Sequence, residues 1–343
     1  MTLVDLPRPS PIQEEEASPA AFERLVTRSL PEGRPLVLRA FAARWRAVET
    51  ASESDESLCA YLCSRDAGQL LDTVELPADQ GGRLFYNEAF TGLNFRWGQA
   101  RLDATLRRLL ALRDDAYPPG AAIQSVPVRS VLPGFEAENP NPILGQAVEP
   151  RIWIGNKVRV APHFDPSENI AVNVAGRRRF TLFPPEALPD LYLGPFEPTP
   201  AGTTISLVDL ADPDLERFPR FARAMGRALV AELEPGDAIY VPYLWWHGVS
   251  SLAPLNMLVN YWWPPTRVVA AHPSNALMHA LIALRSLPPA KREMWRAHFD
   301  YYGFASEQDL SAHIPEPARG VLGRPTRDEI MGVRAGLAKT LTR

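Results

Sequence analysis

Short apolar runs separated by turn-forming residues occupy the chain from residue 121 to residue 265. The runs are rich in Val, Ile and aromatic residues and are bounded by Pro, Gly, Asn or Asp, which is typical of β-strands joined by turns. No long helical pattern lies between them, so they predict an antiparallel sandwich or barrel. The 35 prolines of the 343-residue chain favour such a fold over a helical bundle. The runs are AAIQSVPV (121–128), RIWIGNKVRVAP (151–162), NIAVNVAGRRRFTLF (169–183), ALVAELEPGDAIYVP (228–242) and NMLVNYWW (256–263).

The segments on either side of these runs predict a mainly β fold with helical elaborations. Residues 1–17 are rich in Pro and Glu and are expected to form a flexible arm, and residues 18–120 an α/β elaboration of the barrel. Residues 186–227 indicate an insertion between two strands of the barrel region, 121–265. Residues 266–343 are expected to be helical, with helices over 274–287, 290–304 and 326–341. The last helix carries an apolar stripe formed by Ile330, Val333, Leu337 and Leu341.

Composition limits the partners and the compartment of the protein. The formal net charge is −4, from 36 Lys and Arg against 40 Asp and Glu, so a nucleic-acid partner is not expected. The N-terminal residues lack the pattern of a signal peptide, and no run reaches the roughly 18 apolar residues that span a bilayer, so no membrane partner is expected. The only cysteines, Cys59 and Cys63, are expected to be free thiols on a helix of a cytoplasmic protein.

A histidine and a carboxylate, His163 and Asp165, are separated by one residue in a predicted strand. Alternate side chains of a strand point the same way, so the two could bind one metal ion together. His247 is the third candidate ligand. Two imidazoles and one carboxylate that leave open positions are typical of non-haem Fe(II) sites, whereas zinc more often recruits a third His or Cys. The other four histidines lie in the predicted helical tail, at positions 272, 279, 298 and 313.

Several motifs around these three residues resemble the JmjC-like hydroxylases of the cupin superfamily, above all the asparaginyl hydroxylases that act on hypoxia-inducible factor. The resemblance implies a double-stranded β-helix, or jelly-roll, as the core of the fold. It extends with gaps from about residue 34 to residue 265 and departs from the second cupin motif at Leu244, where glycine is frequent. The matching residues are HFD (163–165), Asn169, Gly176, the basic pair that ends at Arg179, LFPP (182–185), LERFPRF (215–221), GDAIYVPYLWWH (236–247) and LVNYWW (258–263).

The resemblance also implies a second small molecule, 2-oxoglutarate, bound beside Fe(II). The basic residue that meets its distal carboxylate falls on Arg178, whose planar guanidinium suits a carboxylate. Asn169 and Asn260 are expected as polar partners near the iron and the cosubstrate. Two family positions that carry hydroxyl groups fall on Val160 and Ala122, so the cosubstrate shell matches only in part. The tryptophans at positions 245, 246, 262 and 263 are expected mostly to pack the barrel, and some of them to wall the site.

The leading hypothesis is an Fe(II)- and 2-oxoglutarate-dependent dioxygenase that hydroxylates a protein side chain. A metal-dependent cupin enzyme that does not use 2-oxoglutarate and a non-catalytic metal-binding scaffold are the alternatives. The family includes enzymes that act on protein side chains, methylated lysines and modified RNA, so the substrate is not fixed by the motifs. Dimerisation through C-terminal helices in the resembled hydroxylase implies a homodimer. The alternative is that the helices fold back on their own barrel.

Overall fold

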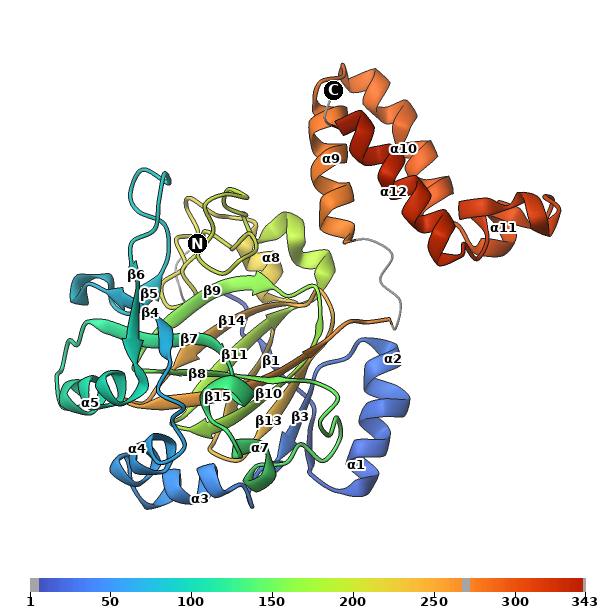
Figure 1. Ribbon diagram of the computed structural model, residues 1–343. Coiled ribbons are helices and arrows are strands. Elements are labelled where there is room, and N and C mark those ends of the chain that lie inside the picture. Colours follow the sequence, from blue (N-terminus) through green and yellow to red (C-terminus); the bar gives the residue numbers. More distant parts are fainter. Residues whose placement is uncertain (1–5, 267–271, 342–343) are drawn as a thin grey trace. The chain divides into compact units, whose positions relative to one another are not determined.

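Eight strands, β8 to β15, pass back and forth between two facing sheets (Figure 1). The computed structural model describes residues 6–266 and 272–341. The smaller sheet contains the strand order β12-β11-β14-β9 and the larger sheet the order β13-β10-β15-β8, with antiparallel neighbours throughout. This arrangement is the predicted jelly-roll core. The strands are β8 (Pro150–Gly155), β9 (Arg159–Phe164), β10 (Glu168–Ala175), β11 (Arg178–Phe183), β12 (Leu229–Leu233), β13 (Ala238–Val241), β14 (Trp246–Ser251) and β15 (Asn256–Trp263).

Strand β10 illustrates why the sequences of the core strands are almost continuous apolar runs. Ile170, Val172 and Val174 pack against helices outside the larger sheet, whereas Ala171 faces the space between the two sheets. Both faces are therefore covered, and alternation between apolar and polar residues is lost. At the turn into β11, Gly176 has φ 70°, and a Cβ there would lie 2.4 Å from Oδ1 of Asn256. Glycine is required at this turn by both the backbone conformation and the space.

N-terminal strands widen both sheets. Strands β2 (Glu14–Glu16) and β3 (Leu36–Arg39) extend the larger sheet at one edge, and β7 (Gly120–Pro127), β4 (Leu70–Leu76) and β6 (Arg96–Arg101) at the other. Strands β1 (Ser10–Pro11) and β5 (Arg83–Leu84) flank the smaller sheet. The expected flexible arm over 1–17 is therefore wrong for residues 10–16, because β1 pairs with β12 and β2 with β3; residues 1–5 lie outside the described residues.

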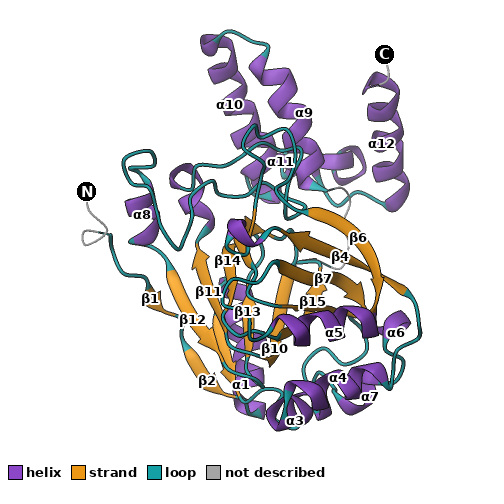
Figure 2. Ribbon diagram, turned by 90° about the vertical axis from the view of Figure 1, so that its left-hand side faces the viewer, coloured by secondary structure: helices purple, strands orange, loops and turns teal. Residues whose placement is uncertain are grey.

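Helices cover the outer face of the larger sheet (Figure 2), and one apolar cluster joins them to it. These helices are α1 (Pro19–Arg24), continued by a π-helical turn and by α2 (Leu30–Glu32), then α3 (Arg46–Glu53), α4 (Asp55–Cys63), α5 (Leu102–Leu112), α6 (Val128–Val131) and α7 (Phe135–Glu138). The insertion between β11 and β12 holds a 3-10 helix (Pro185–Asp190) and α8 (Phe221–Met225). Its apolar residues pack on Phe183 and Trp246, outside the smaller sheet. Cys59 and Cys63 are free thiols on α4.

The C-terminal helices form a separate compact unit that starts at Thr266. It contains α9 (Pro273–Arg285), α10 (Pro289–Phe304), α11 (Glu307–Ser311) and α12 (Arg327–Leu341), with two short 3-10 turns between α11 and α12. Among its described side chains no apolar residue is buried. In the parts of the chain that the structure describes, no helix combines the length and the apolar character needed to cross a membrane.

Candidate metal centre

The structure brings His163, Asp165 and His247 together at one end of the jelly-roll. His163 lies near the end of β9 and faces His247 of β14 in direct register, while Asp165 follows β9 by one residue. The two imidazole centroids are 4.3 Å apart, and Nε2 of His247 lies 3.6 Å from Oδ2 of Asp165. One ligand atom from each residue falls within 4.8 Å of the other two. These distances allow the three side chains to converge on one cation.

Both imidazoles are oriented by backbone carbonyl groups. Nδ1 of His163 lies 3.0 Å from the carbonyl oxygen of Ala161, and Nδ1 of His247 lies 3.1 Å from that of Trp245. A carbonyl oxygen only accepts, so each Nδ1 carries the proton and each Nε2 keeps its lone pair for a metal. Burial, and secondly the neighbouring His247, lower the pKa of His163 well below its ordinary value. The donor set therefore fits a divalent first-row metal ion such as Fe(II).

The carboxylate of Asp165 is held by one of the four tryptophans that the sequence places near the barrel. Nε1 of Trp262, on β15, donates a hydrogen bond to Oδ2 of Asp165 over 3.0 Å. Trp246 instead packs outside the smaller sheet against Phe164, with ring centroids 4.9 Å apart, which is the packing role expected for most of the four tryptophans. One feature of the sequence distinguishes Trp262 from Trp246. Trp262 lies two residues from Asn260 on the same strand, which places both side chains on the interior face.

Hydrogen bonds connect the loop before His247 to the residues around Asp165. The backbone N–H of Leu244 donates to the carbonyl oxygen of Asp165 over 3.2 Å. Leu244 has φ 62°, the left-handed conformation that explains why glycine is frequent at this position of the motif. Glu168 accepts hydrogen bonds from the Tyr240 hydroxyl at 2.6 Å and from the backbone N–H of Tyr243 at 3.1 Å.

Arg178 is a buried cation without a counter-ion. Its residue is 6% exposed, and its guanidinium makes no hydrogen bond or ion pair with any described residue; Nε in particular is buried and unpartnered. Burial lowers the pKa of Arg178 to about 10. Arg177 and Arg179 differ, because both reach Glu232, at 3.6 Å and 2.5 Å. Isolated charges are expensive to bury, so Arg178 has the character of an anion-binding group.

The strand register fixes how far Arg178 lies from the histidines. On β11, Leu182 pairs with His247 and Arg178 pairs with Ser251. Four residues of strand, roughly 13 Å at a rise of about 3.3 Å per residue, therefore separate the two levels. Phe180 and Leu182, which share a strand face with Arg178, belong to the apolar cluster between the sheets. The Arg178 side chain thus lies in the same barrel interior as the triad, but it starts four strand residues farther from the end that holds the triad.

Asn169 and Asn260 form a buried amide pair on neighbouring strands. Nδ2 of Asn260 donates to Oδ1 of Asn169 over 2.9 Å, and Oδ1 of Asn260 has no partner among the described residues. Asn169 is the register partner of Trp262, whose indole contacts Asp165. The two amides therefore lie next to the residues that hold the carboxylate ligand.

Comparison with known proteins places the chain in a family. A family model described as "Cupin-like domain" matches residues 20–267. The chain belongs to this family. The JmjC-type cupin resemblance of the sequence is thereby confirmed.

Individual relatives match a shorter part of the chain. Human "HSPB1-associated protein 1" is 38% identical over 118 residues, which cover 33% of this chain and 23% of that protein. "Lysine-specific demethylase 8" of Xenopus tropicalis is 34% identical over 125 residues, 35% of this chain and 27% of that protein. "tRNA wybutosine-synthesizing protein 5" of Gallus gallus is 34% identical over 101 residues, 29% of each chain. The chain thus matches less than a third of the length of each relative.

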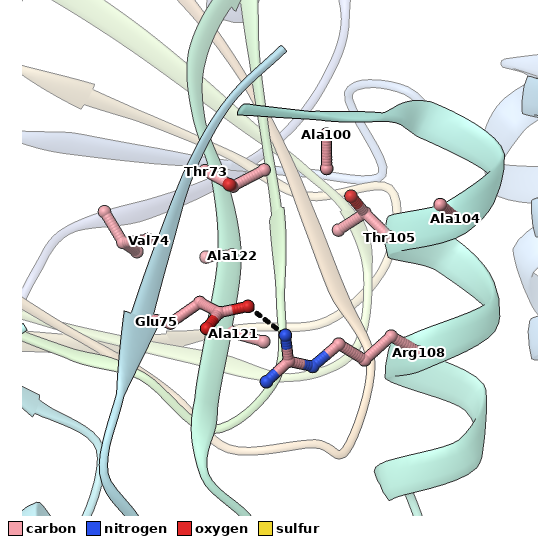
Figure 3. Close-up of a pocket in the computed structure, with 9 residues that line it drawn as sticks. All are labelled: Thr73, Val74, Glu75, Ala100, Ala104, Thr105, Arg108, Ala121 and Ala122. Carbon is pink, nitrogen blue, oxygen red and sulfur yellow. Dashed lines mark hydrogen bonds and ion pairs between the residues drawn. The ribbon is translucent and has the colours of Figure 1, made fainter. Parts of the chain in front are cut away.

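Val160 and Ala122, where the resembled hydroxylases carry hydroxyl groups, have apolar surroundings. Both belong to or pack on the cluster formed by Val74, Leu84 and neighbouring side chains. Ala122 also lines a cavity of about 180 Å³ between β4, β6, β7 and α5 (Figure 3). None of the three candidate metal ligands lines that cavity, and an ion pair between Glu75 and Arg108 spans it in Figure 3.

Proposed function

We propose that the protein is an Fe(II)- and 2-oxoglutarate-dependent oxygenase. The observation that carries this proposal is the unpaired, buried Arg178 in the same interior as the His163–Asp165–His247 triad. Membership of the cupin-like domain family supports it. Bound Fe(II) with 2-oxoglutarate supplies the oxidising chemistry: dioxygen, 2-oxoglutarate and substrate yield succinate, CO2 and a hydroxylated substrate.

The residues of the chain then have separate tasks. The triad holds the metal on one side and leaves its other positions open. Arg178 pairs with the carboxylate of the cosubstrate that lies farther from the metal, and this pairing removes the cost of its isolated charge. Asn169 and Asn260 offer polar contacts beside the metal, and the free Oδ1 of Asn260 accepts from a bound water or ligand. The apolar side chains between the sheets keep bulk water from the reacting groups.

We propose a protein side chain as the substrate. The names of two relatives support a protein partner, one being HSPB1-associated and the other a lysine-specific demethylase. The net charge of −4 also favours a protein over RNA. The relative that acts in tRNA wybutosine synthesis makes RNA the other substrate class to test. The cytoplasm is our proposed location, because the thiols of Cys59 and Cys63 are free.

Anaerobic titration of the Fe(II) protein with 2-oxoglutarate tests the proposed activity. We expect a visible metal-to-ligand charge-transfer band and, once air is admitted, release of succinate. Arg178→Gln should weaken the band, while the matched variant Arg179→Gln should not, since Arg179 is paired with Glu232. An Fe(II) protein that shows neither band nor succinate would point to a cupin enzyme independent of 2-oxoglutarate, or to a scaffold. The apolar Val160 and Ala122 favour that alternative.

We also propose that the protein is a homodimer held by the C-terminal unit. Helices α9, α10 and α12 bury none of their described apolar side chains within the unit, and Ile282, Leu277, Leu337 and Leu341 are each more than half exposed. A helical unit of this size without a buried core is unstable by itself. A groove of about 580 Å³ lined by Leu277, Leu281, Leu284 and Phe299 offers space for apolar side chains of a second copy. Isologous pairing would bury the same surface on both copies.

A further inference from the structure

Two buried hydrogen-bond donors enter the interior of the jelly-roll without an acceptor. One is Nε of Arg178 and the other is Nε1 of the Trp153 indole, and neither has a partner among the described residues. A buried donor left unpaired is unfavourable, and native interiors satisfy most of them. Both residues lie on interior faces of the two facing sheets, so the acceptor of either donor can arrive with a ligand. Because both groups donate, that ligand presents oxygen atoms, as a carboxylate does.

The placement of Trp153 brings it to the same end of the barrel as Arg178. Trp153 of β8 pairs with Leu258 of β15, and Leu258 pairs with Asn173 of β10. Nδ2 of Asn173 donates over 3.2 Å to the carbonyl oxygen of Leu233, the register partner of Arg178. Trp153 and Arg178 thus start from a similar depth, one on each of the facing sheets.

The indole of Trp153 extends toward the metal end. Its ring meets that of Trp262 edge to face, with centroids 6.0 Å apart and an interplanar angle of 87°. Trp262 in turn donates to Asp165. Trp153 also packs against the apolar cluster between the sheets, so the ring lies inside the barrel. The ring therefore extends from the level of Arg178 toward the level of the triad.

The family positions that carry hydroxyl groups offer no hydrogen bond in this chain. Val160 and Ala122 occupy them, belong to or pack on a separate apolar cluster, and carry no hydrogen-bonding side-chain atom. A carboxylate paired with Arg178 has two oxygens and accepts more hydrogen bonds than one guanidinium satisfies. A second donor is therefore needed, and Trp153 carries one without a partner.

We propose that Trp153 is a specificity-determining residue whose indole N–H donates to the carboxylate that Arg178 pairs with. The contact makes the protein prefer a 2-oxo dicarboxylic acid to a 2-oxo monocarboxylic acid. This inference rests on the proposed function, since it concerns the cosubstrate of the same site. Replacement by phenylalanine keeps an aromatic ring against Trp262 and removes only the donor.

The test measures the binding of two acids to the full-length protein loaded with Zn(II), by calorimetry and without turnover. The acids are 2-oxoglutarate and 2-oxobutyrate, which lacks the distal carboxylate. Trp153→Phe should weaken 2-oxoglutarate binding about 10-fold, as expected for a lost hydrogen bond to a charged group, and leave 2-oxobutyrate binding within about twofold. Trp263→Phe, on the outer face of β15, is the matched control and should change neither. In protein with 15N-labelled tryptophan, the indole signal missing from Trp153→Phe should move when 2-oxoglutarate is added.

The outcomes separate this inference from the proposed function. If Arg178→Gln weakens 2-oxoglutarate binding and Trp153→Phe does not, the role of Trp153 is overturned and the proposed function stands. Equal weakening of both acids by Trp153→Phe means that the ring acts by packing alone, which also overturns the role. If the wild-type protein binds 2-oxobutyrate as tightly as 2-oxoglutarate, the preference itself is absent. If it binds neither acid, the proposed function fails as well.

Discussion

Trp262 and Asp165 are joined by a hydrogen bond from the indole Nε1 to the carboxylate Oδ2, 3.0 Å long. The same oxygen lies 3.6 Å from Nε2 of His247, so the indole holds the carboxylate beside the imidazole. Asp165 follows the end of β9 and has no strand neighbour of its own to orient it. Loss of a hydrogen-bond partner that orients a metal ligand typically lowers the metal affinity by roughly 10- to 100-fold.

Trp262→Phe should therefore weaken metal binding about 10-fold while it leaves the apolar packing in place. Competition between the protein and a fluorescent chelator for Co(II) measures the effect directly, without turnover. Trp263→Phe is the matched control, because Trp263 is the next residue of β15 and faces the helices instead. Equal Co(II) affinities for the two variants would mean that the Trp262–Asp165 contact does not position the ligand.

His163→Ala and Asp165→Ala should each remove most of the metal affinity, and the double variant should bind none. Neither side chain holds the sheets together, so the far-ultraviolet circular dichroism should stay close to that of the wild type. Metal content after anaerobic loading with Fe(II), measured by plasma emission, checks the prediction. A double variant that retains stoichiometric iron would show that the ion binds elsewhere.

The sequence predicted the triad because two simple rules are enough to assemble it. Alternation along a strand puts His163 and Asp165 on one side, and the helical tail removes the remaining histidines from consideration. The same alternation separates Arg178 from Arg177 and Arg179, which face the other side of the strand. The isolation of Arg178 could not be predicted in this way, because the sequence does not show that Glu232 of β12 pairs with the outer two arginines and that Arg178 has no acidic partner among the described residues.

Contacts distant in sequence explain the remaining differences. Residues 10–16 appeared to be an arm because their strand partners, Leu229–Val230 for β1 and Val37–Arg39 for β2, are fixed only by the folded topology. The roles of Trp246 and Trp262 depend likewise on which face of each strand is interior. Trp153 belongs to none of the motifs that the sequence analysis used. Its proposed role rests on a buried indole N–H without a hydrogen-bond partner, which a sequence does not reveal.

Arg178→Met should stabilise the ligand-free protein. Replacement of buried charged groups by apolar side chains of similar volume often stabilises a protein, by about 1–4 kcal/mol. For a chain of 343 residues this corresponds to a rise in melting temperature of roughly 1–2 °C per kcal/mol. Differential scanning fluorimetry measures it. In protein already loaded with Zn(II), addition of 2-oxoglutarate should raise the melting temperature of the wild type and not that of the variant. A lower melting temperature for Arg178→Met would indicate that Arg178 has a structural partner.

The same variant gives a pH dependence of known sign. Burial lowers the pKa of Arg178 to about 10, while in the unfolded chain the pKa keeps its higher, ordinary value. The unfolded state therefore binds more protons only between these two values, where the stability of the native state rises with pH. Below about pH 10 the cost of the buried charge is fully present and constant. The difference in melting temperature between Arg178→Met and the wild type should thus not change from pH 6 to pH 9, and a clear trend within that range would argue against a buried, charged Arg178.

Leu337→Glu should weaken the proposed dimer, because it places a charge in the apolar stripe of α12, where Leu337 is 52% exposed in the single chain. Sedimentation velocity at micromolar concentration should show a dimer for the wild type and mainly monomer for the variant. Ala335→Glu is the matched control, since residue 335 lies on the opposite side of the same helix, and it should remain dimeric. Truncation after Pro265 removes the whole helical unit and should give a poorly soluble monomer. A full-length wild-type protein that sediments as a monomer would contradict the proposal, and the exposed side chains of α9, α10 and α12 would then need a different partner to cover them.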